Sequence, residues 1–207
     1  MILNKHILTK QALSLYIIMK PKLPIYKMTI NPLDEESGVD YVALVDEPAI
    51  QVDWFAFKED KPFKFKADAD RRIITGALMI ADLPIYRNDP KMGEFMVVFD
   101  APTIEQIVQK FFKRNKSNNV NEMHDTPIEG VFMYESFITD KDRGILAPKG
   151  FKDVPDGSWF GSYKVENDDV WEDFIKTGEF KGFSVEGMFD LQPVKMRAVN
   201  HLEEFNA

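Results

Sequence analysis

The chain of 207 residues contains no cysteine and only three histidines. The missing thiols exclude a disulfide-stapled scaffold, a thiolate zinc site and a cysteine nucleophile. His6, His124 and His201 lie far apart in the sequence, so a zinc-binding histidine pair on one helix is excluded as well. Each histidine can therefore be weighed individually as a candidate site residue.

An excess of positive charge is also lacking. The 26 Lys and Arg residues stand against 34 Asp and Glu residues, which gives a formal net charge of −8. Because phosphate binding needs clustered positive charge, this balance argues against a nucleic-acid-binding protein. A local basic cluster (Lys110, Lys113, Arg114 and Lys116) is read more simply as the C-terminus of a helix, where cations are favourable.

No hydrophobic run is long enough to cross a bilayer. The apolar stretch at 12–19 has 8 residues, whereas a spanning helix needs about 20. It is followed by Lys20-Pro21-Lys22 and not by a small-residue cleavage site, so we expect no signal peptide and no membrane association. Residues 1–23 are predicted to form an N-terminal arm of a cytoplasmic protein.

The remaining composition is that of a globular protein, with 44% hydrophobic residues and 17 phenylalanines. Many β-prone segments and two amphipathic helices predict an α+β fold, built on a curved, largely antiparallel sheet or barrel. One helix is expected to start at Thr103, and the other follows Asn167 and stops at Gly178. We divide the chain into the arm, a β-rich segment at 24–71, a main domain at 72–190 and a C-terminal tail at 191–207.

The predicted last strand, 180–190, carries a serine that could act as a nucleophile. Alternation places Ser184 and Glu186 on one face of this strand. Gly182 and Gly187 flank them and would allow another backbone to approach closely. Taken alone, a serine on a polar strand face is more often an ordinary surface residue.

Two further residues could work with that serine. His124 stands where a polar loop enters a strand, and an imidazole there could serve as a general base because it gains and loses a proton near neutral pH. Glu135 interrupts the apolar face of the strand predicted at 129–138. A carboxylate in that position either orients a histidine or lies at the solvent edge of the sheet.

Two motifs, in their order along the chain, resemble a phage serine protease domain often called XkdF-like. They are His-Asp-Thr-Pro-Ile-Glu-Gly at 124–130 and Gly-Phe-Ser-Val-Glu-Gly at 182–187. The resemblance spans about 24–190, and it extends to the prohead proteases of tailed phages and, in fold, to the herpesvirus assemblins. It implies Ser184 as nucleophile, His124 as base and backbone N–H groups around the oxyanion.

The third catalytic residue is not defined by the motifs. Assemblins use a second histidine, for which His201 is the only candidate here, and Glu186 stands where many relatives have glycine. Glu135 and Glu186 compete with His201 for this role, and Glu186 lies about 6.5–7 Å along the strand from Ser184, given the rise per residue. We predict that Glu135 orients His124, because it follows the histidine on a strand while His201 lies in a tail.

The resemblance implies a serine endopeptidase of phage head maturation. Its partners would be the phage scaffold protein, the major capsid protein and further copies of itself, inside the assembling prohead in the host cytoplasm. It implies no metal and no organic cofactor. The alternative is a non-catalytic capsid or portal accessory protein that retains the protease fold.

Overall fold

The strands form three four-stranded sheets in a computed structural model that describes residues 23–46, 64–151 and 153–193. The first sheet has the order β12-β1-β6-β5, with bounds Asp190–Pro193, Ile25–Thr29, Gly93–Val98 and Ile85–Asp89. The second is β3-β4-β10-β9, with bounds Lys66–Asp68, Ile73–Met79, Trp159–Val165 and Val131–Ile138. The third is β11-β2-β7-β8, with bounds Gly182–Met188, Gly38–Val45, Val120–Glu122 and Thr126–Pro127.

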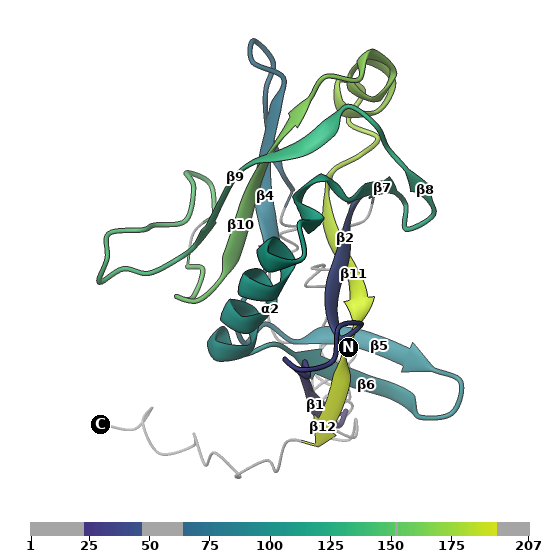
Figure 1. Ribbon diagram of the computed structural model, residues 1–207, viewed down its shortest axis with the longest axis vertical. Coiled ribbons are helices and arrows are strands. Elements are labelled where there is room, and N and C mark those ends of the chain that lie inside the picture. Colours follow the sequence, from purple (N-terminus) through teal and green to yellow (C-terminus); the bar gives the residue numbers. More distant parts are fainter. Residues whose placement is uncertain (1–22, 47–63, 152, 194–207) are drawn as a thin grey trace, which may run out of the picture.

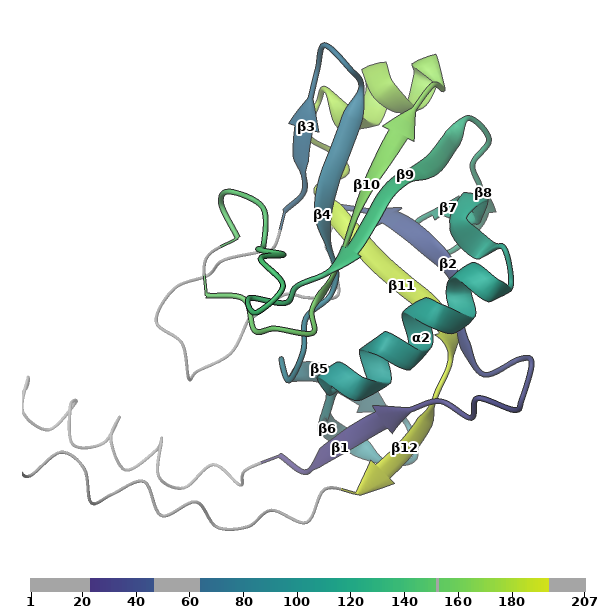
Figure 2. The same ribbon diagram turned by 60° about the vertical axis from the view of Figure 1, so that its left-hand side comes forward.

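All three sheets are open, as Figures 1 and 2 show. Within the described part of the chain, every strand pair is antiparallel except β1 with β6 and β2 with β7. The predicted α+β class and the largely antiparallel pairing are confirmed. The prediction of one curved sheet or barrel is wrong, because β11 and β12 follow each other in the chain but pair with different partners, β2 and β1.

The early strands belong to the same sheets as the late ones. β1 pairs with β6 and β12, and β2 lies between β11 and β7. The segment at 24–71 therefore supplies inner strands to two sheets. The strand β12 reaches into the predicted tail, while the predicted arm lies almost wholly outside the described residues. No helix among the described residues is long and apolar enough to cross a membrane.

The long helix α2, Ala101–Lys113, packs against β2 and β10 and so joins two of the sheets (Figure 1). Its buried stripe includes Ile104, Ile107 and Phe111, which the helical spacing predicts. The helix begins earlier than the predicted start at Thr103. Asp100 is the N-cap, and its Oδ1 accepts a hydrogen bond of 3.1 Å from the Thr103 backbone N–H.

The Asp100 cap gives a first testable prediction. Asp100→Ala is expected to lower the free energy of unfolding by about 1 kcal/mol at neutral pH, because it leaves a helix N–H without its acceptor. Burial acts to raise the pKa of Asp100, but the bonds from Lys27 and Thr103 outweigh it and the net pKa is lowered. The carboxylate therefore stabilises the fold above its unfolded pKa of about 4, and this contribution is lost as the pH falls through the lower folded value.

Urea melts of wild type and Asp100→Ala at neutral and acidic pH measure this effect. The difference between the two chains should shrink below about pH 4. Asp142→Ala, in an exposed turn, is the control and should show little change at either pH. A difference that grows on acidification would contradict the assigned role of the cap.

The second helix is short and π-helical, η2 at Val170–Ile175. As predicted, Asn167 caps this segment, its Oδ1 accepting from the Val170 N–H at 3.0 Å, and Gly178 follows with a φ of +73°. Trp171 is only 3% exposed and belongs to the main hydrophobic core. The apolar stripe predicted for this helix therefore does face the core.

Trp171 and Ser184 should differ sharply in what they contribute to stability. Trp171→Ala is expected to lower the free energy of unfolding by about 3–5 kcal/mol, because it empties a large buried volume. Ser184→Ala should cost much less, about 1 kcal/mol or below, since it removes one small buried hydroxyl and leaves no large cavity. Equal destabilisation in urea melts would contradict the core assignment of Trp171.

Candidate active site

Ser184 lies in a row of paired residues that crosses three strands. It is aligned with Ala43 on β2, and Ala43 is aligned with Asn121 on β7. Residues paired across a sheet point to the same face, so Ser184 and Asn121 share a face on either side of the Ala43 methyl group. All three residues are buried, with Ser184 4% exposed.

Alternation along β11 determines which residues reach this face. Phe183 is buried in the main core, and Val185 packs against it from the same side. Ser184 and Glu186 therefore point the opposite way. A bulge follows Glu186, and at this place Gly187 passes so close to β2 that a Cβ on it would lie 1.9 Å from the Gly38 carbonyl oxygen.

His124 reaches the site from the turn between β7 and β8. Met123 and His124 both adopt left-handed backbone conformations, with φ of +49° and +64°. Such conformations are uncommon for residues with side chains and are held by their surroundings. The Met123 N–H donates to the Leu44 carbonyl at 3.1 Å, which ties this turn to β2.

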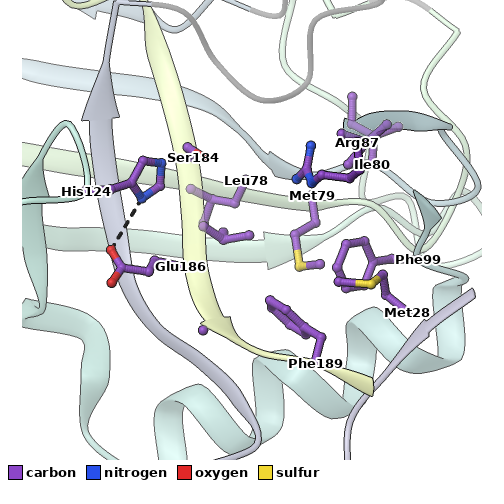
Figure 3. A pocket seen from close by; sticks show the side chains of 13 residues that line it. Met28, Leu78, Met79, Ile80, Arg87, Phe99, His124, Ser184, Glu186 and Phe189 are labelled. Carbon is purple, nitrogen blue, oxygen red and sulfur yellow. Dashed lines mark hydrogen bonds and ion pairs between the residues drawn. The ribbon is translucent and has the colours of Figure 1, made fainter. Parts of the chain in front are cut away.

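A carboxylate holds the His124 ring in place (Figure 3). His124 Nδ1 lies 3.3 Å from Glu186 Oε2, and the same oxygen accepts a 2.9 Å hydrogen bond from Asn121 Nδ2. The contact favours the tautomer with the proton on Nδ1, which leaves Nε2 as an acceptor. In Figure 3 the second ring nitrogen lies on the side of the ring toward Ser184.

Ser184 and His124 line the same pocket. In the described part of the chain no hydrogen bond joins Ser184 Oγ to the imidazole, and catalytic hydrogen bonds are often long before substrate binds. The two residues belong to one sheet region but do not lie on neighbouring strands. β2 lies between β11 and β7, and His124 bridges it from the turn.

The carboxylate at His124 is Glu186 and not the predicted Glu135. Glu135 lies on β9, in the sheet of β4 and β10, where it is exposed and aligned with Ser162. From the sequence, Glu186 is a competing candidate for this role, at about 6.5–7 Å from Ser184 along the strand. The relevant distance is to His124, which the β7–β8 turn brings over the end of β11. The other candidate, His201, lies outside the described residues.

Behind the three polar groups lies a largely apolar pocket of about 280 Å³. Its wall is shared by all three sheets, because Met28 and Arg87 come from β1 and β5, Leu78 from β4 and Ser184 from β11. The remaining lining includes Met79, Ile80, Ile85, Phe99 and Phe189. The described residues contain no cluster of acidic and histidine side chains that could hold a metal ion.

A buried serine, an imidazole and a carboxylate thus meet at one pocket, which is the set of groups that serine hydrolases use. A family model described as "Putative phage serine protease XkdF" matches residues 61–192, and the chain belongs to this family. The match confirms the resemblance inferred from the motifs and includes Ser184, His124 and Glu186. Searches of curated proteins and of solved structures found no match.

Proposed function

We propose that this chain is a serine endopeptidase in which Ser184 is the nucleophile, His124 the general base and Glu186 the residue that orients the histidine. The observation that carries the proposal is the contact between His124 Nδ1 and Glu186 Oε2 at 3.3 Å. It leaves Nε2 free to accept the Ser184 proton in the pocket that both residues line.

The reaction would proceed by acyl transfer. Ser184 Oγ attacks the scissile carbonyl carbon while its proton passes to His124 Nε2, and the resulting imidazolium is stabilised by the Glu186 carboxylate. The imidazolium then protonates the departing amine, which leaves an acyl group on Ser184. Water, deprotonated by the same imidazole, releases the acid product and regenerates the serine.

A side-chain adjustment belongs to this mechanism. Because Ser184 and His124 are not hydrogen-bonded among the described contacts, rotation of the serine or the ring has to bring Oγ and Nε2 to about 2.6–3.2 Å. Substrate entering the pocket would exclude water and favour that geometry. The hydrogen bond from Asn121 holds Glu186 in place, so the adjustment involves only Ser184 and His124.

Membership of a phage protease family supports a role in virus assembly. The proposed substrates are the scaffold protein, the N-terminal segment of the major capsid protein and the protease itself. Cleavage would take place inside the assembling prohead in the host cytoplasm. Removal of these segments would make head expansion irreversible and free internal volume for DNA.

Co-expression with the capsid and scaffold proteins of the same phage tests this function. Mass spectrometry should find shortened capsid and scaffold chains with wild type, and full-length chains with Ser184→Ala. Ser162→Ala is a matched control, because Ser162 is also a buried strand serine but bonds to Thr75 Oγ1 away from the pocket. Heads that incorporate the wild-type chain without any cleavage would instead support the non-catalytic structural role.

A further inference from the structure

Arg87 differs from the other arginines of the described chain. Each of the other four forms an ion pair with a carboxylate: Arg71 with Asp68, Arg72 with Asp168, Arg114 with Asp40, and Arg143 with Asp140. Within the described residues Arg87 has no acidic partner, and its guanidinium donates to the Tyr86 carbonyl at 2.9 Å. Among the five described arginines, Arg87 is therefore the one without a carboxylate partner.

Arg87 lines the same pocket as Ser184. Arg87 extends from β5 into the wall of the pocket that contains Ser184, and Figure 3 shows the two side chains on different sides of the apolar lining. Desolvation by its neighbours lowers the pKa of Arg87, although a guanidinium stays charged at neutral pH. The Arg87 side chain is nevertheless exposed, so its guanidinium is open to an incoming anion, which would give it a charged partner.

The rest of the pocket is apolar and indicates which group of a ligand would lie beside Arg87. Leu78, Phe99 and Phe189 give it apolar walls, and its volume of about 280 Å³ lies just below the range of sites that enclose whole small-molecule ligands. A space of this size suits one large side chain of an extended peptide. The guanidinium fork suits a carboxylate, which it can bind through two parallel hydrogen bonds.

We propose that the pocket selects peptide segments in which a large apolar residue is followed or preceded closely by a carboxylate, the apolar side chain filling the pocket and the carboxylate binding Arg87. This inference rests on the proposed protease function and names its substrate class. The carboxylate has two sources, an acidic side chain within the peptide or the free C-terminus of a chain. Both present the same group to the guanidinium, and the test separates them.

Binding to the full chain carrying Ser184→Ala tests the inference without turnover. The probes are short fluorescent peptides, acetylated and amidated, with one leucine and with Glu, Gln or Lys placed in turn at each neighbouring position. One further Gln peptide ends in a free carboxylate near the leucine. Fluorescence anisotropy should show the best Glu peptide binding about tenfold more tightly than its Gln counterpart. The free-acid peptide shows whether a chain terminus is the preferred source.

Substitutions at Arg87 test whether this residue causes the preference for a carboxylate. Arg87→Gln should abolish the preference for Glu over Gln, Arg87→Glu should favour the Lys peptide, and Arg87→Lys should retain a reduced preference because it keeps the charge but loses the fork. Arg143→Gln, which removes an exposed arginine outside the pocket, should bind like the parent. Thermal melts of each variant establish that differences in binding do not arise from unfolding.

The outcomes for substrate class and for catalysis are separable. If wild type cleaves peptides with the same selectivity as Arg87→Gln, the inference is overturned and the protease function stands. If binding depends on Arg87 and the chain with Ser184 intact cleaves none of the bound peptides, the protease function fails and the recognition of a carboxylate stands. Equal binding of the Glu, Gln and Lys peptides, or no binding of any, overturns the inference.

Discussion

Replacing Glu186 with glutamine is expected to slow peptide cleavage by about 10²- to 10⁴-fold. Glu186 Oε2 contacts His124 Nδ1, and in the proposed mechanism the carboxylate both selects the ring tautomer and stabilises the imidazolium that forms during attack. A neutral amide removes the charge and can offer an N–H where the ring needs an acceptor. Because this interaction strengthens in the transition state, the loss should appear in kcat while KM changes little.

Glu135→Gln is the matched control for Glu186→Gln. It makes the same chemical change on an exposed position of β9, and cleavage should remain within about twofold of wild type because surface changes have little effect on stability. Asn121→Ala should fall between the two, since it removes the 2.9 Å hydrogen bond that holds Glu186 but leaves the carboxylate present. Scaffold-cleavage time courses measure all three variants.

A different pattern of cleavage losses would assign the orientation of His124 to another residue. Strong loss in Glu135→Gln with normal cleavage in Glu186→Gln would restore the choice made from sequence. Normal cleavage in both, with strong loss in His201→Ala, would support the Ser–His–His arrangement of the assemblins. Ser184→Ala provides the baseline without the nucleophile in each time course.

Gly187→Ala is expected to destabilise the fold by about 3 kcal/mol or more, which is at the high end for one added methyl group. The new Cβ would lie 1.9 Å from the Gly38 carbonyl oxygen, and backbone atoms of Gly38 and Val39 are also within 2.8 Å. β2 cannot move away easily, because it is paired on both sides, with β11 and β7. Urea denaturation at neutral pH measures the loss.

The effect of Gly187→Ala should also reach the candidate active site. The bulge lies between Glu186 and Gly187, so a shift of β11 at this place would move the carboxylate away from His124. The control is Gly144→Ala, where nothing lies within 4 Å of the added methyl but φ is +73°. The free energy of unfolding of this variant should fall by only about 1–2 kcal/mol, the backbone cost of placing a residue with a side chain in the left-handed region. Its cleavage rate should not change. Equal destabilisation by the two variants would contradict the close approach at Gly187.

Features that depend on neighbours along the chain could be predicted from the residues alone. The twofold alternation on 180–190 places Ser184 and Glu186 on one face and Phe183 on the other, as observed. Helical spacing identified the buried stripe of α2, and the two glycine-containing motifs led to the correct family. These features are local because side-chain direction follows the backbone period, which a few residues establish.

Which side chains meet at the pocket depends on how the strands pair in three dimensions. Glu135 looked suitable because it follows His124 closely, but β9 pairs with β10 while the turn of His124 belongs to the sheet of β2 and β11. The roles inferred for Asn121 and Arg87 carried no local signal, because an asparagine on a strand and an arginine on a hairpin are common surface residues. Their significance depends on strand pairing and on which charges remain unpaired, and both arise from contacts between residues distant in the sequence.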